Sequence, residues 1–166
     1  MKKLFLLLAT AICVASSALA QTPIKYQGEV DLGFSLGVGT WAINRVNVHT
    51  IHGAKIGDYF SAGLGLGSDI YVAQGEESDL IIPIYLNVKG YLPTKTKVTP
   101  YASFDIGGGF GASEYAKGLS GMMLSPAIGV KVGMFKAQVG YNVQKISESG
   151  ISINFSAVQL KAGVMF

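Results

Sequence analysis

The chain has 166 residues, enough for one domain, and 49% of them are hydrophobic while only 14% are charged. A soluble domain carries roughly a quarter of charged residues, so this balance excludes an ordinary soluble surface for the whole chain.

The N-terminus has the three parts of a secretory signal. Lys2 and Lys3 precede an apolar run at 4–14, and Ala18-Leu19-Ala20 provides a small-x-small cleavage site. A retained membrane helix would need about 20 apolar residues, but Thr10 interrupts this run and Ser16 and Ser17 prevent its extension. We therefore predict a cleaved signal peptide at 1–20 and a single mature domain at 21–166.

The mature chain offers little for several classes of function. Loss of Lys2 and Lys3 lowers the formal charge from +3 to +1, which gives no electrostatic argument for a nucleic-acid partner. The single cysteine, Cys13, lies in the signal, so the mature chain has no disulfide and no thiolate nucleophile or ligand. Beyond Gln21 no apolar run reaches the length of a spanning helix. A secreted, oily chain of this kind is either a soluble barrel with an apolar lumen or a barrel embedded in an outer membrane.

Eight segments of the mature chain alternate between apolar and polar residues, with the two-residue period of a strand that has unlike faces. In chain order they are 26–38, 45–50, 60–72, 80–92, 102–111, 124–133, 137–144 and 158–166. The connections carry turn residues or charges, as in the acidic loop 74–79, the Thr- and Lys-rich turn 93–100 and the tight turn 134–136. Pro83 removes a ladder donor, so we expect it near a strand end or at a bulge. The pattern predicts an all-β, eight-stranded antiparallel up-and-down barrel.

Side-chain volume decides which face points outward. An eight-stranded barrel has a lumen only wide enough for its own side chains. The apolar positions are almost all Leu, Ile, Val and Phe, whereas the polar positions are rich in glycine. We therefore predict a polar, filled lumen and a lipid-facing apolar exterior, that is, a transmembrane barrel. Aromatic residues at the strand ends predict two interfacial girdles, one of Trp41, Tyr71 and Tyr115 and the other of Tyr59, Phe60, Tyr91, Tyr101, Phe135 and Phe166.

The signal peptide, the eight amphipathic strands and the C-terminal Val158-x-Leu160-x-Ala162-x-Val164-x-Phe166 together resemble a known family. They are similar to the small outer-membrane β-barrel proteins of Gram-negative bacteria, of the OmpA-transmembrane-domain and OmpX type. The resemblance implies a location in the cell outer membrane and contact with outer-membrane lipids and lipopolysaccharide. It also implies Phe166 as an assembly signal for the outer-membrane insertion machinery. We expect a monomer without a cofactor.

The alternating polar positions of the strands place four acids and four bases in the predicted lumen. They are Glu29, Asp31, Asp69 and Asp105 with Arg45, Lys89, Lys131 and Lys161. Unpaired buried charge costs several kcal/mol, so we expect a closed, paired network. Asp69 and Asp105 lie on the two strands that flank the strand of Lys89, which makes them the expected partners of that lysine.

These residues predict a structural or interaction protein whose lumen is a plug, with a narrow pore for ions or small solutes as the alternative. A lipid-modifying enzyme of the outer leaflet is a third hypothesis, but serine chemistry needs a positioned base. With the N-terminus in the periplasm, His49 and His52 fall toward the periplasmic end, away from the outer leaflet, and we expect His49 to be a hydrogen-bonding group of the lumen. We predict no catalytic, metal or cofactor site. The Gly63-x-Gly65-x-Gly67 pattern has a period of two with no helix after it, unlike a phosphate loop, and predicts room for large inward side chains.

Overall fold

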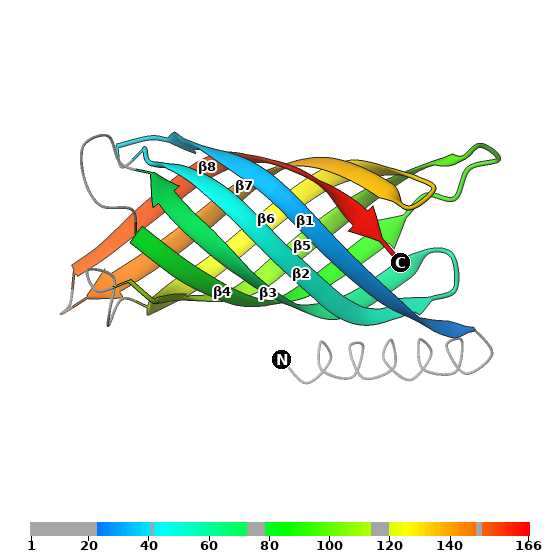
Figure 1. Cartoon of the computed structure of the whole chain (residues 1–166), viewed down its shortest axis with the longest axis horizontal. Coiled ribbons are helices and arrows are strands. Elements are labelled where there is room, and N and C mark those ends of the chain that lie inside the picture. The colour runs from blue at the N-terminus through cyan, green and yellow to red at the C-terminus, as the bar shows by residue number, and fades with distance from the viewer. Residues whose placement is uncertain (1–22, 41, 73–78, 114–119, 149–150) are drawn as a thin grey trace, which may run out of the picture.

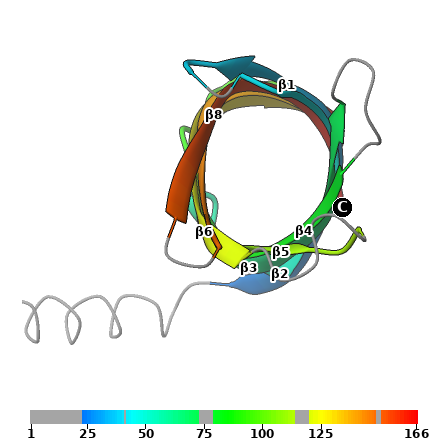
Figure 2. The same ribbon diagram turned by 90° about the vertical axis from the view of Figure 1, so that its left-hand side faces the viewer.

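The protein is a closed barrel of eight antiparallel strands, seen from the side in Figure 1 and along its axis in Figure 2. The computed structural model describes residues 23–40, 42–72, 79–113, 120–148 and 151–166. The predicted signal peptide at 1–20 lies outside these residues. The strands are β1 (Ile24–Val38), β2 (Asn44–Ile56), β3 (Phe60–Val72), β4 (Asp79–Tyr91), β5 (Val98–Gly111), β6 (Ser120–Val132), β7 (Phe135–Glu148) and β8 (Ile151–Met165).

Each strand pairs with its neighbours in the chain, and β1 closes the barrel by pairing with β8. Cross-strand partners traced from Gly28 around the barrel return to β1 at Val38, a stagger of ten residues. A stagger of this kind tilts the strands by about 35–45° to the barrel axis. The predicted up-and-down topology is confirmed.

Six of the eight strands are longer than the sequence pattern predicted, and β3 and β4 have the predicted length. The last strand begins at Ile151 rather than Val158, and β2 continues through Gly53 to Ile56. Residues 151–157 alternate poorly, but they pair with β7 along their whole length, which gives them a strand conformation. Gly53 lies opposite Gly63, where a Cβ atom would collide with the facing backbone. Glycine at 53 therefore permits close strand contact rather than marking a turn.

The barrel is apolar outside and polar inside, as predicted. One exposed apolar side chain from each strand illustrates the outer face: Leu32, Val48, Leu64, Leu86, Phe104, Ile128, Val139 and Leu160. One buried polar side chain from each strand illustrates the lumen: Glu29, Arg45, Asp69, Lys89, Asp105, Ser125, Lys136 and Gln159. A soluble protein reverses this arrangement, so the apolar face is the lipid-facing one. Within the described ranges, no helix has the length and hydropathy needed to cross a membrane.

Three of the aromatic residues predicted for the girdles point into the lumen instead. Tyr71, Tyr91 and Tyr101 are each at most 5% exposed. They share the parity of the inward charged residues on their strands, and parity rather than closeness to a strand end sets the direction of a side chain. Outward aromatic residues do occur at one end of the barrel: Tyr26, Tyr59, Phe60, Phe135 and Phe166. Trp41 and Tyr115 lie outside the described residues.

Two prolines interrupt the hydrogen-bond ladders without changing the register. Pro83 lies inside β4 and Pro126 inside β6. The β3–β4 pairing skips Pro83, and the β6–β7 pairing skips Pro126, yet the partners on either side of each gap keep one register. Pro83, expected near a strand end or at a bulge, is the fifth of the 13 residues of β4, and no bulge shifts the register around it. The missing N–H leaves a local gap in an otherwise continuous ladder.

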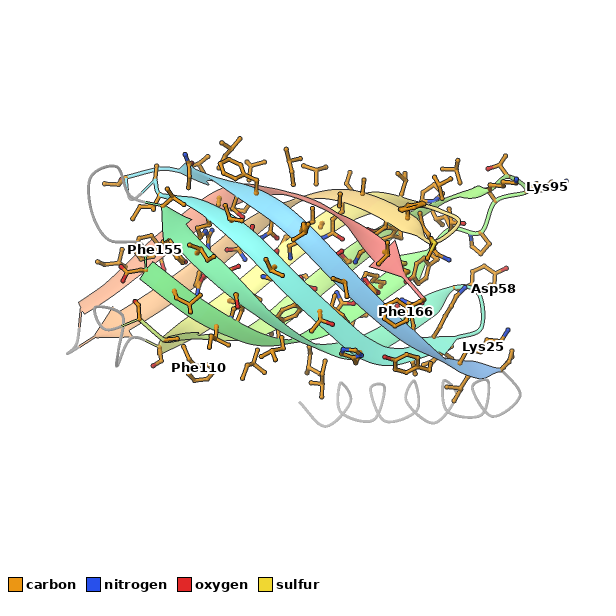
Figure 3. The ribbon with its side chains drawn as sticks, in the orientation of Figure 1. Lys25, Asp58, Lys95, Phe110, Phe155 and Phe166 are labelled. Atoms are coloured by element: carbon orange, nitrogen blue, oxygen red, sulfur yellow. The ribbon has the colours of Figure 1, made fainter. Side chains whose placement is uncertain are left out.

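The barrel has two distinct rims. The start of β1, the C-terminal Phe166 and the turns 57–59, 92–97 and 133–134 lie at one end, which we call the terminal rim. The ends of β1, β3, β5 and β7 and the starts of β2, β4, β6 and β8 lie at the opposite rim (Figure 1). Lys25, Asp58, Lys95 and Phe166 lie toward the terminal rim and Phe110 and Phe155 toward the other (Figure 3).

Arginine at a lipid-facing position should be harmful in proportion to its depth. Leu86→Arg, at the middle of β4, is expected to cost about 2–4 kcal/mol of stability, whereas Ile24→Arg at the terminal rim should cost about 0–1 kcal/mol. Urea unfolding in lipid vesicles measures both losses. Equal losses would contradict the assignment of the outer face to lipid.

Restoring the missing ladder donor should strengthen the β6–β7 seam. Pro126→Ala supplies an N–H toward β7, so we expect a gain of about 0.5–1.5 kcal/mol. Hydrogen exchange of the new backbone amide at position 126 should be slow. A fast-exchanging amide would show that the seam is open for a reason other than proline. Ile128→Ala, an outward position of β6 with an intact ladder, serves as the control and should give no such gain.

Candidate functional site: the charged lumen

A single carboxylate, that of Glu29, joins three strands across the lumen. Lys89 Nζ on β4 donates to Glu29 Oε1 at 2.9 Å, and Lys136 Nζ on β7 donates to Glu29 Oε2. Lys136 also donates to Asp31 Oδ2 at 2.7 Å. All four side chains are buried. Because β1, β4 and β7 are not neighbours in the sheet, this ion cluster ties opposite walls of the barrel together.

Two sequence predictions about this cluster are wrong. The cation that pairs with Glu29 and Asp31 is Lys136, which the alternation assigns to the β6–β7 turn, whereas Lys131 is only half-buried near the terminal rim. No ion pair of Lys131 occurs within the described residues. The turn falls at Gly133, whose φ of 60° favours glycine. The strand β7 therefore begins at Phe135, and Lys136 is a lumen-facing strand residue opposite Lys131. The acidic partner of Lys89 is Glu29, across the lumen, rather than Asp69 or Asp105 on the adjacent strands.

His49 centres a second polar cluster of the lumen. Its Nε2 lies 2.9 Å from Asp69 Oδ1 and its Nδ1 lies 2.9 Å from the Tyr85 hydroxyl. Asn47 also donates to Asp69 Oδ1, at 2.5 Å. His49 is therefore a hydrogen-bonding group of the lumen, as the sequence predicted.

Lys161 and Asp105 connect the His49 cluster with the Glu29 cluster. Lys161 Nζ lies 3.2 Å from His49 Nδ1 and 4.0 Å from Asp105 Oδ2. Asn87 donates to Asp105 at 2.5 Å and accepts a hydrogen bond from Lys89 at 2.6 Å. Charge and amide groups therefore form a continuous chain along the lumen wall.

Arg45 departs from the expected acid–base pairing. Its guanidinium donates to the Tyr71 hydroxyl and to Gln144 Oε1, both at 3.0 Å, and lies 5.0 Å from the centroid of the Tyr71 ring. No carboxylate pairs with it in the described part of the chain, although its side chain is buried. Its hydrogen bonds and the cation–π contact replace an ion pair. The lumen is thus not a closed set of four acids with four bases.

An apolar layer crosses the lumen among the polar clusters. Ile51, Tyr85 and Met123 are buried and pack together. Gly65 makes room for the Tyr85 ring, since a Cβ atom there would collide with it, and Gly67 does the same for His49. The prediction that inward glycines make room for large inward side chains is confirmed at Gly65 for Tyr85, and at Gly67 the ring is that of His49. Ile51 and Met123 are apolar, like the residues that face the lipid. In the sequence only their odd, inward positions indicate that they belong to the lumen.

The C-terminal residue, Phe166, forms two backbone hydrogen bonds with β1. The backbone N–H of Phe166 donates to the Gly28 carbonyl at 2.9 Å, and Gly28 N–H donates back at 2.7 Å. The Phe166 ring is 59% exposed and lies over Gly28, where a Cβ atom would collide with it. The predicted assembly signal is therefore an outward aromatic held at the seam between β1 and β8.

The described residues contain no cluster of three or more His, Cys, Asp or Glu side chains suited to a metal ion. His52, on the outer face, contacts the Tyr26 hydroxyl at 2.6 Å and Thr50 Oγ1 at 2.9 Å. Neither histidine has a serine hydroxyl among its hydrogen-bond partners in the described strands.

Comparison with known proteins identifies the fold. No protein-family model and no curated protein matches the chain. Its structure is similar to that of Neisserial surface protein A (NspA), with a TM-score of 0.66 and 14% identity over 86% of this chain and 97% of that chain. The chain has the fold of the small eight-stranded outer-membrane β-barrels. Its apolar exterior and polar lumen agree with that fold. The similarity to these outer-membrane structures confirms the predicted location in the outer membrane.

Other solved structures with this barrel fold have different roles. The outer membrane enzyme PagL matches with a TM-score of 0.59 and 8% identity over 82% of this chain and 98% of that chain. The N-terminal β-barrel domain of Pseudomonas aeruginosa OprF matches with a TM-score of 0.53 and 14% identity over 87% of this chain and all of that domain, 100%. Such identities support a common fold and no shared activity.

The Glu29 cluster predicts a coupled loss of stability. Lys89→Met and Glu29→Gln should each destabilise the barrel, by up to about 3–5 kcal/mol where a charge is left buried and unpaired. The double variant should lose about 0.5–3 kcal/mol less than the sum of the two, because the residues are in contact. Urea unfolding in lipid vesicles measures the cycle.

The matched control for this cycle pairs Lys89→Met with Asp69→Asn. Asp69 bonds to His49 and Asn47 rather than to Lys89, so these two losses should add within about 0.5 kcal/mol. Additive losses in the Glu29 cycle, or a coupling of equal size in the Asp69 cycle, would contradict the observed pairing.

Proposed function

We propose that this protein is an outer-membrane barrel with a structural or interaction role, a sealed lumen and no catalytic activity. The observation that carries the proposal is the filling of the lumen. The ion pairs around Glu29 and the apolar layer of Ile51, Tyr85 and Met123 lie inside the barrel, and each of these side chains is at most 5% exposed.

A narrow pore is the second candidate, because the lumen is lined with charge from end to end. Conduction would require an ion to displace Lys89 or Lys136 from Glu29 and to cross the apolar layer. Removing one partner of a buried ion pair costs about 3–5 kcal/mol, and an apolar constriction resists wetting. Both barriers favour the plug over the pore.

The similarity to PagL brings an enzyme into consideration, but the local chemistry favours a non-catalytic role. The His49 and Asp69 pair resembles the base and orienting acid of a catalytic triad. Its third partner, however, is the hydroxyl of Tyr85, a buried member of the apolar layer. A lipid substrate on the outer face of the barrel could not reach this group without opening the wall.

The proposed partners are the lipids that surround the barrel, lipopolysaccharide in the outer leaflet and the insertion machinery. The exposed ring of Phe166 at the closing seam supports its role as the assembly signal. The barrel closes with its own first and last strands, which leaves no free edge for pairing with a second copy and supports a monomer.

Bilayer conductance tests the sealed lumen. The wild-type protein should give no steady conductance in a planar lipid bilayer. The triple variant Ile51→Ala, Tyr85→Ala, Met123→Ala removes the apolar layer and should give a steady, measurable current, because water can then enter the lumen.

A matched triple variant on the outer face provides the control. Leu64→Ala, Leu86→Ala and Ile106→Ala occupy one cross-strand row on the lipid side and should leave the bilayer silent. Steady conductance by the wild-type protein would contradict a sealed lumen and support the pore. Loss of an acyl chain from lipid A incubated with the pure protein would support the enzyme instead.

A further inference from the structure

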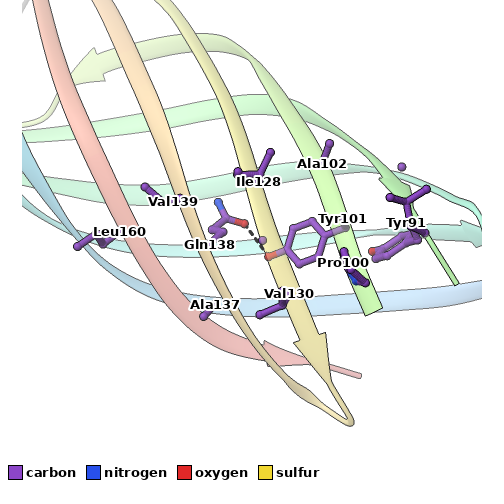
Figure 4. Close-up of a pocket in the computed structure, with 13 residues that line it drawn as sticks. Tyr91, Pro100, Tyr101, Ala102, Ile128, Val130, Ala137, Gln138, Val139 and Leu160 are labelled. Carbon is purple, nitrogen blue, oxygen red and sulfur yellow. Dashed lines mark hydrogen bonds between the residues drawn. The ribbon is translucent and has the colours of Figure 1, made fainter. Parts of the chain in front are cut away.

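The outer wall of the barrel has an apolar groove next to the terminal rim. It has a volume of about 870 Å³ and runs across β4 to β8, as Figure 4 shows. Its outward lining includes Leu92, Ala102, Ile128, Val130, Ala137 and Leu160. The buried Tyr91 and Tyr101 and the half-buried Gln138 also line it. This volume lies within the range of about 300–1,000 Å³ typical of ligand sites.

Small residues in adjacent rows of the sheet create the groove. Gly90 pairs with Ala102, and on the next row Pro100 pairs with Val130, which pairs with Ala137. Large side chains stand around this low area, among them Leu92, Ile128 and Leu160, each more than half exposed. The hollow therefore follows from side-chain size on one part of the wall, with no distortion of the barrel.

A second hollow continues the groove toward the closing seam. It has a volume of about 420 Å³, and it shares Ala137, Gln138 and Leu160 with the first. Its other lining residues include Leu32, Phe34 and Ala162 on β1 and β8. The two hollows on either side of Leu160 give room for two apolar chains.

The rim at the end of the groove is basic. The β4–β5 turn carries Lys95 and Lys97, both exposed, and it follows directly on Leu92 of the groove. The threonines between the lysines bond to the turn itself: Thr94 Oγ1 accepts from the Thr96 N–H at 3.3 Å, and Thr96 Oγ1 accepts from the Val98 N–H at 3.3 Å. The lysines are thus the polar groups left facing outward.

Neither hairpin that forms the groove's rim end, 90–101 or 128–139, contains an Asp or Glu. The acid of the neighbouring β2–β3 turn, Asp58, has its Oδ1 atom 3.7 Å from Lys55 Nζ. An anionic group at the end of the groove would therefore meet lysines and no acidic side chain of these two hairpins.

We propose that this groove binds one phospholipid with an anionic headgroup, taken from the leaflet next to the terminal rim. Its acyl chains lie in the two hollows and its phosphate contacts Lys95 and Lys97. The groove lies on the lipid-facing wall, so acyl chains reach it from the bilayer without passing through water. The apolar walls and the cationic end match the two parts of an anionic lipid.

A second copy of the chain fits this surface less well. Two barrels inserted in the same direction and joined by these faces would bring their Lys95 and Lys97 turns side by side at one membrane surface. Like charges in that arrangement repel each other. A lipid headgroup neutralises the same lysines.

Native mass spectrometry of the detergent-solubilised protein tests the site. Palmitoyl-oleoyl phosphatidylglycerol is the probe, and phosphatidylcholine with the same chains is the zwitterionic comparison. The wild-type protein should retain one phosphatidylglycerol more tightly than phosphatidylcholine. Lys95→Gln with Lys97→Gln should lower that affinity by about fivefold per lysine and leave phosphatidylcholine unchanged.

The groove itself is tested by filling it. Ala102→Phe with Ala137→Phe should abolish retention of both lipids, because the rings occupy the hollow. Ala54→Phe, at an outward position of β2 near the same rim, and Lys25→Gln, on β1, are the controls and should bind as the wild type does. Heat-modified gel mobility verifies that each variant folds, and the lysine variants lie in a turn outside the barrel wall.

Three results would overturn the proposal. Equal retention of the two lipids by the wild type would contradict a contact between the headgroup and the lysines. Unchanged retention after Ala102→Phe with Ala137→Phe would contradict binding in the groove. Dimers in place of lipid adducts would assign the face to a second copy. The lumen is untouched by these variants, so bilayer conductance is independent of every outcome.

Discussion

The double ion pair of Glu29 with Lys89 and Lys136 is the interaction on which the interior of this barrel depends. It joins strands that are far apart in the sheet, and hydrogen bonds extend from it through Asn87 to Asp105. A charge in this lumen is removed from water and surrounded by a low-dielectric wall. It is tolerated only when an opposite charge or several hydrogen-bonding groups are held against it. The eight-stranded closure provides that geometry because its lumen is just wide enough for side chains from opposite walls to meet.

The same closure explains the distribution of residue types on both faces. Large inward rings such as Tyr85 and His49 fit because glycines on neighbouring strands leave space for them. Large outward side chains have no such limit, since lipid adapts to them. Where outward residues are small, as at Ala102 and Ala137, the wall has a hollow that lipid can fill. The volume of the inward side chains therefore determines how well they fill the lumen, and the volume of the outward ones determines where lipid contacts the wall.

The fold by itself leaves the biological role open. Barrels similar to this one include a surface protein and an enzyme, so function has to be argued from the side chains. Here the described side chains form a charged lumen and an apolar exterior. Both rims carry charge of both signs, with Lys95 and Asp58 exposed at the terminal rim and Lys145 and Asp79 near the opposite one.

The sequence alone determined the class of fold, the number of strands and the direction of each face. A two-residue period is a local property, and the volume limit of an eight-stranded lumen then leaves one choice of inside and outside. The same parity correctly placed Glu29, Asp31, Arg45, Asp69, Lys89, Asp105 and Lys161 among the buried side chains.

Only the tertiary structure decided which of those groups meet. Partners across a lumen are set by the stagger and tilt of the closed sheet, which no local pattern encodes. For that reason Lys89 pairs with Glu29 across the lumen rather than with an acid on a neighbouring strand. Arg45 pairs with no acid among the described residues. The β6–β7 turn ends before Phe135, so Lys136 belongs to β7 and faces the lumen beside its cross-strand partner Lys131. Only Lys136 reaches Glu29 and Asp31, because the distance between groups across a lumen depends on the closed sheet and not on the alternation alone.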